Sequence, residues 1–391
     1  YFDPSWAEAE PGLIRDLGYS SPDTWPVVDG NTERIVIMDQ QDVTLKDMST
    51  AITWGNNRDK YNTTFVHIRN CEEVVLENLH FLQADTGYQG THTIFVEDCG
   101  RVFLRDSSMH GLVHDYHVRM EGNREVIIDN VEIAGHDYGD GILKTGGGIF
   151  IENGDESLGG VGVESISSPN PRDLQWLQIT NCFVHDSHSN PYDFNHDGLL
   201  IHSGSNSLIY NNLFQNWVAR DAAFDVSHRR WQDAEYVDKR IHIEKNRFVN
   251  NQYMKCPGRS VQSNEIVFLD NDFRQASLAI YHYGYRVLYL ENVFDQAYSP
   301  TFLALWGVTG DILFEDCSFI FPDLYAFFRE GSQGTPTDHT NIRCSNNTYY
   351  IGQLDKWLDG QEVTLGSWEE WMNYGLDTGS ILKDASEYQG N

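Results

Sequence analysis

A short pattern of apolar and polar positions recurs along most of the chain. Each copy holds an apolar residue, any residue, a small polar or charged residue, two further residues and an apolar or aromatic residue, as in Leu76-Glu-Asn-Leu-His-Phe81. Successive copies begin mostly 21 to 34 residues apart, and one gap of 50 contains a Gly- and Ser-rich stretch at 153–170. The copies begin at Leu45, Leu76, Leu104, Ile128, Gln178, Ile209, Ile243, Phe268, Tyr289, Phe314 and Cys344.

A unit of this length cannot bury its own apolar face, whereas stacked units share a continuous core. Short β-rich runs such as Ile94-Phe-Val96 and Ile149-Phe-Ile151 lie beside the copies, and Asn or Asp in the third position suits tight corners. The pattern predicts an all-β chain, a right-handed parallel β-helix of about 10–12 rungs. A β-propeller is the alternative, but its blades of ~40–50 residues are longer than most of these spacings.

The two ends of the chain differ from the repeat. Residues 5–17 predict a short helix that caps the open end of the solenoid, and residues 365–375 predict another at the far end. No linker or shift of composition divides the chain. We therefore expect one domain, with a capping segment at 1–30, the parallel β-helix at 31–355 and a second capping segment at 356–391.

The charge balance narrows the classes of partner. The 391 residues include 58 acidic and 27 basic ones, for a formal net charge of −31. Nucleic acid is not an expected partner, because phosphate binding needs a basic face. A membrane-spanning segment is not expected either, because no apolar run approaches 18 residues. The N-terminus has no signal-peptide pattern, so a signal peptide has been removed or was never present.

Six cysteines are too few for a disulfide scaffold, and no CxxC motif suggests a zinc site. Cys71 and Cys99 each lie five residues before the first apolar residue of a copy. They should stack on neighbouring rungs, either as a reduced pair or as a disulfide. Cys344 stands at a core position and should be inert.

Charged residues share a register near the middle of the repeat. Asp140, Asp221 and Lys255 each lie seven residues after the last apolar position of a copy, and Asp197 joins them if 187–196 is an insertion. Equivalent positions on successive rungs stack about 4.8 Å apart, so we expect these side chains in one column.

Tyr116 and Ile280 hold the same register at the outer rungs, so the charged column is confined to the centre. Four residues further along come Lys144 and Asp225. Carboxylates this close need a proton or a cation, and calcium, with six to eight oxygen ligands, suits such a cluster. A lysine with a lowered pKa is a competent general base. Basic and polar residues gather nearby: His196, His202, Arg220, His228, Arg229, Arg230 and Arg259.

Alternative interpretations of these residues stay open. Asp140, in an Asp-Gly step, also suits a structural corner. Lys255 precedes Cys256-Pro-Gly258 and could be a solvated loop lysine, and Lys144 competes with it for the role of base.

The repeat over roughly 35–350, with the tail Ser367-Trp-Glu-Glu-Trp371, resembles the right-handed parallel β-helix superfamily of carbohydrate-active proteins. That superfamily is similar in architecture to pectate lyases. The resemblance implies a secreted protein that binds an acidic polysaccharide, and we expect a monomer.

A narrower resemblance concerns the site. Calcium-dependent β-helix pectate lyases with a lysine base carry an Asp-Gly step, an acidic cluster one rung later and then the lysine. Asp197-Gly198, the pair Asp221 and Asp225, and Lys255 are similar to that arrangement. The resemblance implies calcium bound by Asp197, Asp221 and Asp225.

The implied reaction is β-elimination in a uronate-containing chain. A cation, or Arg259 in its place, would neutralise the uronate carboxylate, and Lys255 would remove the adjacent carbon-bound proton. The leaving oxygen would take a proton from water or from a nearby His or Tyr, for which His228 is the candidate. The expected substrate-binding residues are Arg220, Arg229, His196, His202 and Tyr281.

Two other functions remain open. A glycoside hydrolase on the same fold would use two of the carboxylates Asp197, Asp221 and Asp225. It is a serious alternative because the family's second acidic residue is replaced here by Ala222. A non-catalytic glycan-binding or adhesive solenoid is the third, and the central charged patch argues against it.

Overall fold

The computed structural model describes 27–29, 34–54, 64–84, 91–137, 143–152, 174–187, 197–202, 206–217, 222–226, 240–255, 265–281, 286–296, 301–306, 310–330 and 339–388. The chain divides into two compact units, which we describe one at a time. Unit 1 comprises residues 1–205 and 211–221, and unit 2 comprises residues 206–210 and 222–391.

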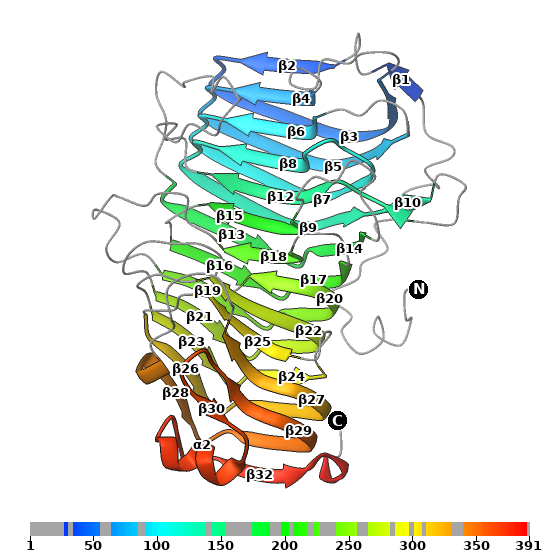
Figure 1. Cartoon of the computed structure of the whole chain (residues 1–391). Helices are drawn as coiled ribbons and strands as arrows, with labels where there is room; N and C mark the ends of the chain where they lie inside the picture. The colour runs from blue at the N-terminus through cyan, green and yellow to red at the C-terminus, as the bar shows by residue number, and fades with distance from the viewer. Residues whose placement is uncertain are drawn as a thin grey trace. The chain divides into compact units, whose positions relative to one another are not determined.

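Unit 1 is built of stacked parallel strands (Figure 1). They are β1 (Val27–Asp29), β2 (Ile35–Met38), β3 (Asp42–Thr53), β4 (Thr64–Arg69), β5 (Glu73–Gln83), β6 (His92–Glu97), β7 (Arg101–Gly111), β8 (Tyr116–Glu121), β9 (Glu125–Ala134), β12 (Gly147–Glu152), β13 (Trp176–Thr180), β14 (Phe183–Ser187), β15 (Leu199–His202) and β17 (Leu213–Trp217). A small antiparallel pair, β10 (His136–Asp137) and β11 (Leu143–Lys144), branches from them.

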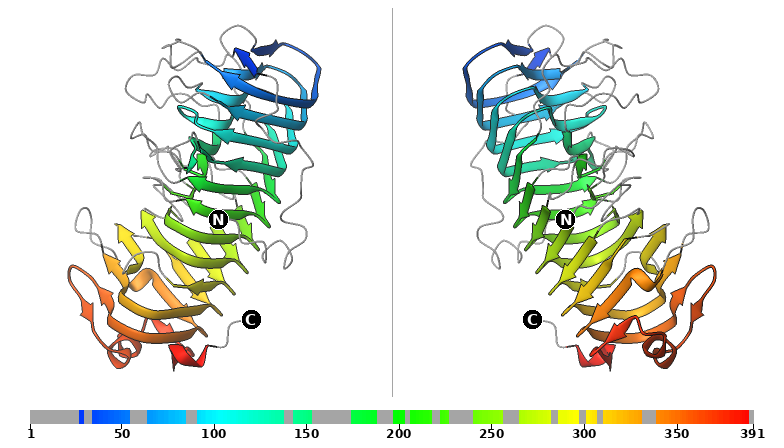
Figure 2. Two further views of the ribbon diagram at one scale, coloured as in Figure 1. Left: turned by 90° about the vertical axis from the view of Figure 1, so that its right-hand side faces the viewer. Right: turned by 90° about the vertical axis from the view of Figure 1, so that its left-hand side faces the viewer.

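The strands of unit 1 form three faces. On the first face β2, β4, β6, β8, β12 and β15 pair in parallel. The strands β3, β5, β7 and β9 each run over the second face and then the third. Beyond β9 the second face continues with β13, and the third continues with β14 and β17. The views in Figure 2 show the long strands turning from one face to the next.

Each long strand turns at a residue in the left-handed region, namely Asp47, Asn78, Asp106 and Asn130, with φ of 49° to 58°. Asn and Asp tolerate this conformation better than other non-glycine residues. They occupy the third position of the repeat, so the predicted corners are confirmed.

Unit 2 repeats this plan. Its elements are β16 (Asn206–Tyr210), β18 (Phe224–Val226), β19 (Arg240–Glu244), β20 (Arg247–Lys255), β21 (Glu265–Leu269), β22 (Asp272–Tyr281), β23 (Arg286–Leu290), β24 (Val293–Asp295), β25 (Thr301–Trp306), β26 (Ile312–Glu315), β27 (Ser318–Glu330), η2 (His339–Asn341), β28 (Ile342–Ser345), β29 (Thr348–Asp359), β30 (Thr364–Leu365), α2 (Trp368–Tyr374), β31 (Asp377–Thr378), β32 (Ile381–Asp384) and η3 (Ala385–Glu387). The strands are again almost all parallel, and among the described residues of unit 2 only β30 pairs antiparallel, with β29. The prediction of a mostly β chain with long parallel sheets, consistent with a parallel β-helix, is confirmed.

One copy of the repeat was aligned wrongly in the sequence. Gln178 was taken as its first apolar position, but Ile179 pairs with Ile128 and Gln178 pairs with Ile127. The left-handed corner is accordingly Asn181 and not Thr180. The error arose because Thr and Asn are adjacent here and both satisfy the polar position of the pattern.

The helix predicted near the C-terminus is confirmed. α2 begins after Ser367, whose side chain accepts the N–H of Glu370, while the Glu370 carboxylate accepts the N–H of Ser367. This reciprocal capping box satisfies backbone donors that the first turn leaves open. Trp371 is fully buried against the last rungs. The helix predicted at 5–17 lies outside the described residues. None of the helices in the described ranges is long and apolar enough to cross a membrane.

Cys71 and Cys99 lie at the same corner of neighbouring rungs, as predicted. Both are buried and reduced, and the N–H of Cys71 donates to the Sγ of Cys99 over 3.4 Å. Cys344 is also a buried free thiol, and burial raises its pKa well above the ordinary value, so the prediction of an inert core cysteine stands.

Candidate functional site

Asp225 and Lys255 meet in unit 2. Asp225 lies in the middle of β18 and pairs in register with Lys255 at the end of β20. The neighbours Phe224 and Val226 are buried in the core, and alternation along the strand turns Asp225 to the opposite side. Its Oδ2 lies 3.3 Å from the Nζ of Lys255, and the exposed fractions of the two side chains are 6% and 24%. A buried carboxylate thus holds a lysine that solvent still reaches.

This pairing corrects the predicted register, in which Lys255 shared its column with Asp221 and Ile280. In the structure Lys255 pairs with Asp225 on one side and with Ala279 on the other. The ladder between β20 and β22 is irregular between Asn251 and Met254, and this shifts every later residue of β20. This shift explains why Lys255 pairs with Ala279 and not with Ile280, and counting residues from the motif could not include it.

Asp197 belongs to unit 1. It is buried directly before β15, and its Oδ2 lies 3.4 Å from the hydroxyl of Tyr116, which donates to it. The N–H of Gly148 donates to its backbone carbonyl over 2.9 Å. A Cβ added to Gly148 would lie 1.9 Å from the carbonyl oxygen of Gly198, so the two backbones approach as only glycine permits. The Asp-Gly step therefore has a structural role in this rung.

Most of the other predicted site residues lie outside the residues that the structure describes. Lys144, His202 and Tyr281 are placed by backbone alone, in β11, β15 and β22. Within the described ranges, no group of three or more His, Cys, Asp or Glu side chains could hold a metal ion. The calcium site stays a prediction. Asp140, Asp221, His196, Arg220, His228, Arg229, Arg230 and Arg259 lie outside the described residues.

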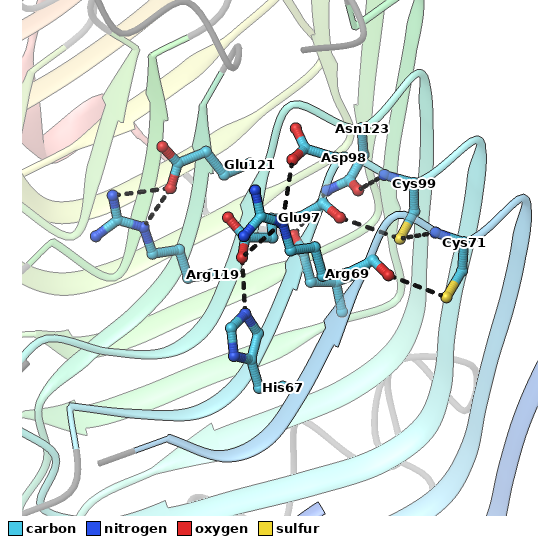
Figure 3. Close-up of polar contacts among 10 residues, drawn as sticks. His67, Arg69, Cys71, Glu97, Asp98, Cys99, Arg119, Glu121 and Asn123 are labelled. Atoms are coloured by element: carbon cyan, nitrogen blue, oxygen red, sulfur yellow. Dashed lines mark hydrogen bonds and ion pairs between the residues drawn. The ribbon is translucent and has the colours of Figure 1, made fainter. Parts of the chain in front are cut away.

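A charged network that the sequence analysis missed covers the first face of unit 1 (Figure 3). His67 lies 2.8 Å from the Oε1 of Glu97, and Arg69 approaches Glu97 and Asp98 to 3.7 and 3.8 Å. Arg69 and Glu97 share a column with Glu121 and Glu152, because their strands pair in register. The signal was a polar residue at the end of β4, β6, β8, β12 and β15.

Arg119 is the centre of this network. It contacts Asp115, Glu121 and Glu152 at 3.2, 3.0 and 3.6 Å, and its guanidinium lies 5.0 Å from the ring centre of Phe150. Burial alone would lower its pKa, but the carboxylates outweigh burial and raise it. Arg119 is thus a buried cation whose charge is balanced by the neighbouring carboxylates.

A second unpredicted group, which we call the third-face histidine cluster, consists of His110, Glu132, His185 and Asp186. His110 and His185 place their Nε2 atoms 3.6 and 3.2 Å from the same Oε1 of Glu132. The Nδ1 of His185 lies 2.8 Å from Asp186. Its ring also stacks on Phe183, with centres 3.7 Å apart. Sequence counting missed the cluster because it followed the last apolar position of each motif and not the polar residues around it.

Burial disfavours the charged forms of Glu132, His185 and Asp186, yet the hydrogen bonds and opposite charges around them outweigh it. Burial would raise the pKa of Glu132, but hydrogen bonds to His110 and His185 lower it overall. Burial would lower the pKa of His185, but its bonds to Asp186 and Glu132 raise it overall. The carboxylates and His185 are therefore held in their charged forms.

Comparison with known proteins gives little to add to this geometry. No protein-family model matches the chain, and no curated protein matches it. Among solved structures, the Streptococcus pneumoniae surface protein and adhesin PfbA is similar, with 12% identity over 91% of each chain and a TM-score of 0.40. The fold follows from the strand pairing described above, and a likeness at this level supports no particular activity.

Proposed function

We propose that this protein is a right-handed parallel β-helix that cleaves a uronate-containing polysaccharide by β-elimination, with Lys255 as the base. The observation that supports the proposal is the contact between Lys255 and the buried Asp225 on adjacent rungs, 3.3 Å apart. We expect the protein outside the cell, where polymers of this kind are found, and we expect it to act without nucleic acid or membrane.

The geometry suggests what each of the two residues contributes. The buried carboxylate of Asp225 fixes the end of a long, flexible side chain, and this positioning lowers the entropic cost of reaching a reacting group. Lys255 remains partly exposed, so a substrate proton can come within its reach. In the reaction, neutral Lys255 takes the carbon-bound proton beside the uronate carboxylate, and the electron pair of that bond forms a carbon–carbon double bond as the bond from carbon to the glycosidic oxygen breaks. The leaving oxygen takes a proton from water.

Charge sets a condition on this step. An opposite charge at this distance favours the ammonium form of an amine, whereas a general base must be neutral to accept a proton. Elimination should therefore be faster on the alkaline side of neutrality. Calcium, if bound, would polarise the uronate carboxylate, but it needs six to eight oxygen ligands, and the described residues do not assemble them here. No step is assigned to it.

The test is ultraviolet absorbance of the unsaturated product across a panel of uronate polysaccharides, with calcium and with chelator. Lys255→Ala and Lys255→Arg should both abolish the signal, by at least about 100-fold, because neither side chain replaces a neutral amine. Lys46→Ala is the matched control, since Lys46 is an exposed lysine on the second face of unit 1. It should leave turnover unchanged.

Each other outcome has a definite meaning. Full activity in Lys255→Ala would remove Lys255 from the mechanism and leave Lys144 as the candidate base. New reducing ends without absorbance would identify a hydrolase instead. Binding of a polysaccharide without either signal would identify the non-catalytic solenoid.

A further inference from the structure

The third-face histidine cluster joins successive rungs of unit 1. His110 lies on β7, Glu132 on β9, and His185 with Asp186 on β14, and these strands are hydrogen-bonded neighbours. Asn216 on β17 donates to Asp186 over 2.9 Å and extends the chain of contacts to a fourth rung. The cluster is independent of Asp225 and Lys255, which belong to unit 2.

The two contacts of His185 depend on a proton. Its Nδ1 faces Asp186 at 2.8 Å and its Nε2 faces Glu132 at 3.2 Å. A neutral imidazole carries one N–H, so it can donate to one carboxylate only, whereas an imidazolium donates to both. The geometry of His185 is thus that of a doubly protonated ring, and loss of one proton would set a lone pair against a carboxylate.

The β10–β11 hairpin contacts two of the strands that carry this cluster. β10 contacts β7, β11 contacts β14, and His136 of β10 pairs antiparallel with Lys144 of β11. The N–H of Gly135, directly before the hairpin, donates to the carbonyl of His185 over 3.3 Å. The rung that carries His185 therefore supports the hairpin directly.

We propose that a proton on His185 is a pH-dependent latch, which ties β14 to β9 and holds the β10–β11 hairpin in place until a rise in pH removes that proton. The proposal goes beyond the proposed function and does not depend on it. The elements packed around the latch carry the following titratable residues: His80 on β5, His110 on β7, Glu132 on β9, His136 and Asp137 on β10, Lys144 on β11 and Asp186 on β14. The described residues of β17 contribute no titratable group.

The direction of the pH dependence follows from the shifts. The pKa of His185 is raised above its ordinary 6.5, so its contribution is complete below about pH 6.5 and is lost as the pH rises through the raised value. The pKa values of Glu132 and Asp186 are lowered from 4.5 and 3.8, so their contributions are lost only in strong acid. The latch is closed between about pH 5 and 6.5 and opens above that range.

Hydrogen exchange of the intact protein, followed by mass spectrometry and corrected for the intrinsic rate at each pH, tests the latch. Between pH 6 and pH 9 the exchange of residues 134–137, 143–144 and 183–187 should speed up by about tenfold, because deprotonation removes one hydrogen bond of His185 to a charged group. Strands β23 and β26 of unit 2 should show no such step. The absence of a step in 183–187 would overturn the proposal.

His185→Gln removes the titrating ring and should give fast exchange at both pH values, so that the step disappears. His242→Gln, on the second face of unit 2, is the matched control and should retain the wild-type step. If His185→Gln does not fold, Glu132→Gln provides an independent test, since removal of one carboxylate should move the step to lower pH. A step unchanged in either His185→Gln or Glu132→Gln would sink the idea.

Discussion

The two units fill the same type of rung with different cores. In unit 1, one inward column of the first face is aliphatic and almost fully buried: Val66, Ile94, Val118, Ile149 and Leu199. In unit 2, a column of aromatic rings stacks at 4.7 to 5.0 Å between centres: Phe248, Phe273, Phe294, Phe319 and Tyr349. The third-face column of unit 1 that corresponds to these rings is mixed, with Phe81, Met109, Ile133, Val184 and Phe214. One backbone plan therefore accepts different packing solutions.

The residues that follow the left-handed corners also differ between the two units. At the corners between the second and third faces of unit 2, Asn follows Lys245, Asp270, Glu291 and Asn346, whereas Cys317 follows Asp316. Asn271 and Asn292 each accept the N–H of the Asn on the rung before, over 2.9 Å. In unit 1 the equivalent positions vary, and Leu79 donates its N–H to the hydroxyl of Ser107. Unit 1 instead carries charged networks on its outer faces. Among the described residues, unit 2 thus has the more regular corners, whereas unit 1 carries the charged networks.

The largest effect should come from breaking the aromatic column. Phe294→Ala removes a fully buried ring that contacts Phe273, Phe319 and Phe302, and should cost about 3–5 kcal/mol of unfolding free energy. Val118→Ala in the aliphatic column should cost less, about 2 kcal/mol, because it removes less apolar surface. Urea unfolding of both variants measures the difference, and equal losses would contradict the contrast between the cores.

An intermediate effect should come from the Asn corners. Asn292→Ala leaves the N–H of Asn271 and the carbonyl of Phe268 without the Asn292 amide, both in buried positions. The expected cost is about 1–3 kcal/mol, because buried polar groups would lose their hydrogen bonds. Asn292→Asp keeps the acceptor and should lose less. Thermal unfolding of the two variants side by side checks this order, and a neutral Asn292→Ala would show that the ladder is dispensable.

The smallest effect should come from the cap of α2. Ser367→Ala removes one half of the capping box and should cost about 1 kcal/mol, whereas Ser367→Thr should keep most of the stability. Circular dichroism melting curves measure both. A loss as large as that of Phe294→Ala would mean that closure of the last rung, and not the core, limits the stability of unit 2.

The fold could be predicted because each copy of the repeat marks both a corner and a core position. Asn78 and Asp106 mark left-handed corners, and their apolar neighbours Leu76 and Leu104 mark the core. These signals are local, so one sequence was enough. The alignment failed by one residue at Gln178, where two neighbouring polar residues made the local signal ambiguous.

The candidate site was harder to predict because it depends on register across rungs. Lys255 pairs with Asp225 on one side and, after an irregularity inside β20, with Ala279 on the other, and no residue type announces either register. Glu132 and His185 come together across a long separation in sequence, and each alone looks like a surface residue. What the sequence could indicate was where charge accumulates, and not which charges touch.

The uniform corners have a consequence for how such a surface can change. Because every rung adds one strand spacing, about 4.8 Å, two side chains in one column can be separated only by whole multiples of that distance. Loss or duplication of a single rung would move His110 relative to Glu132 by a full step, with no intermediate positions available. Distances on these faces therefore vary in discrete steps, whereas the connecting segments between faces can change length without altering them.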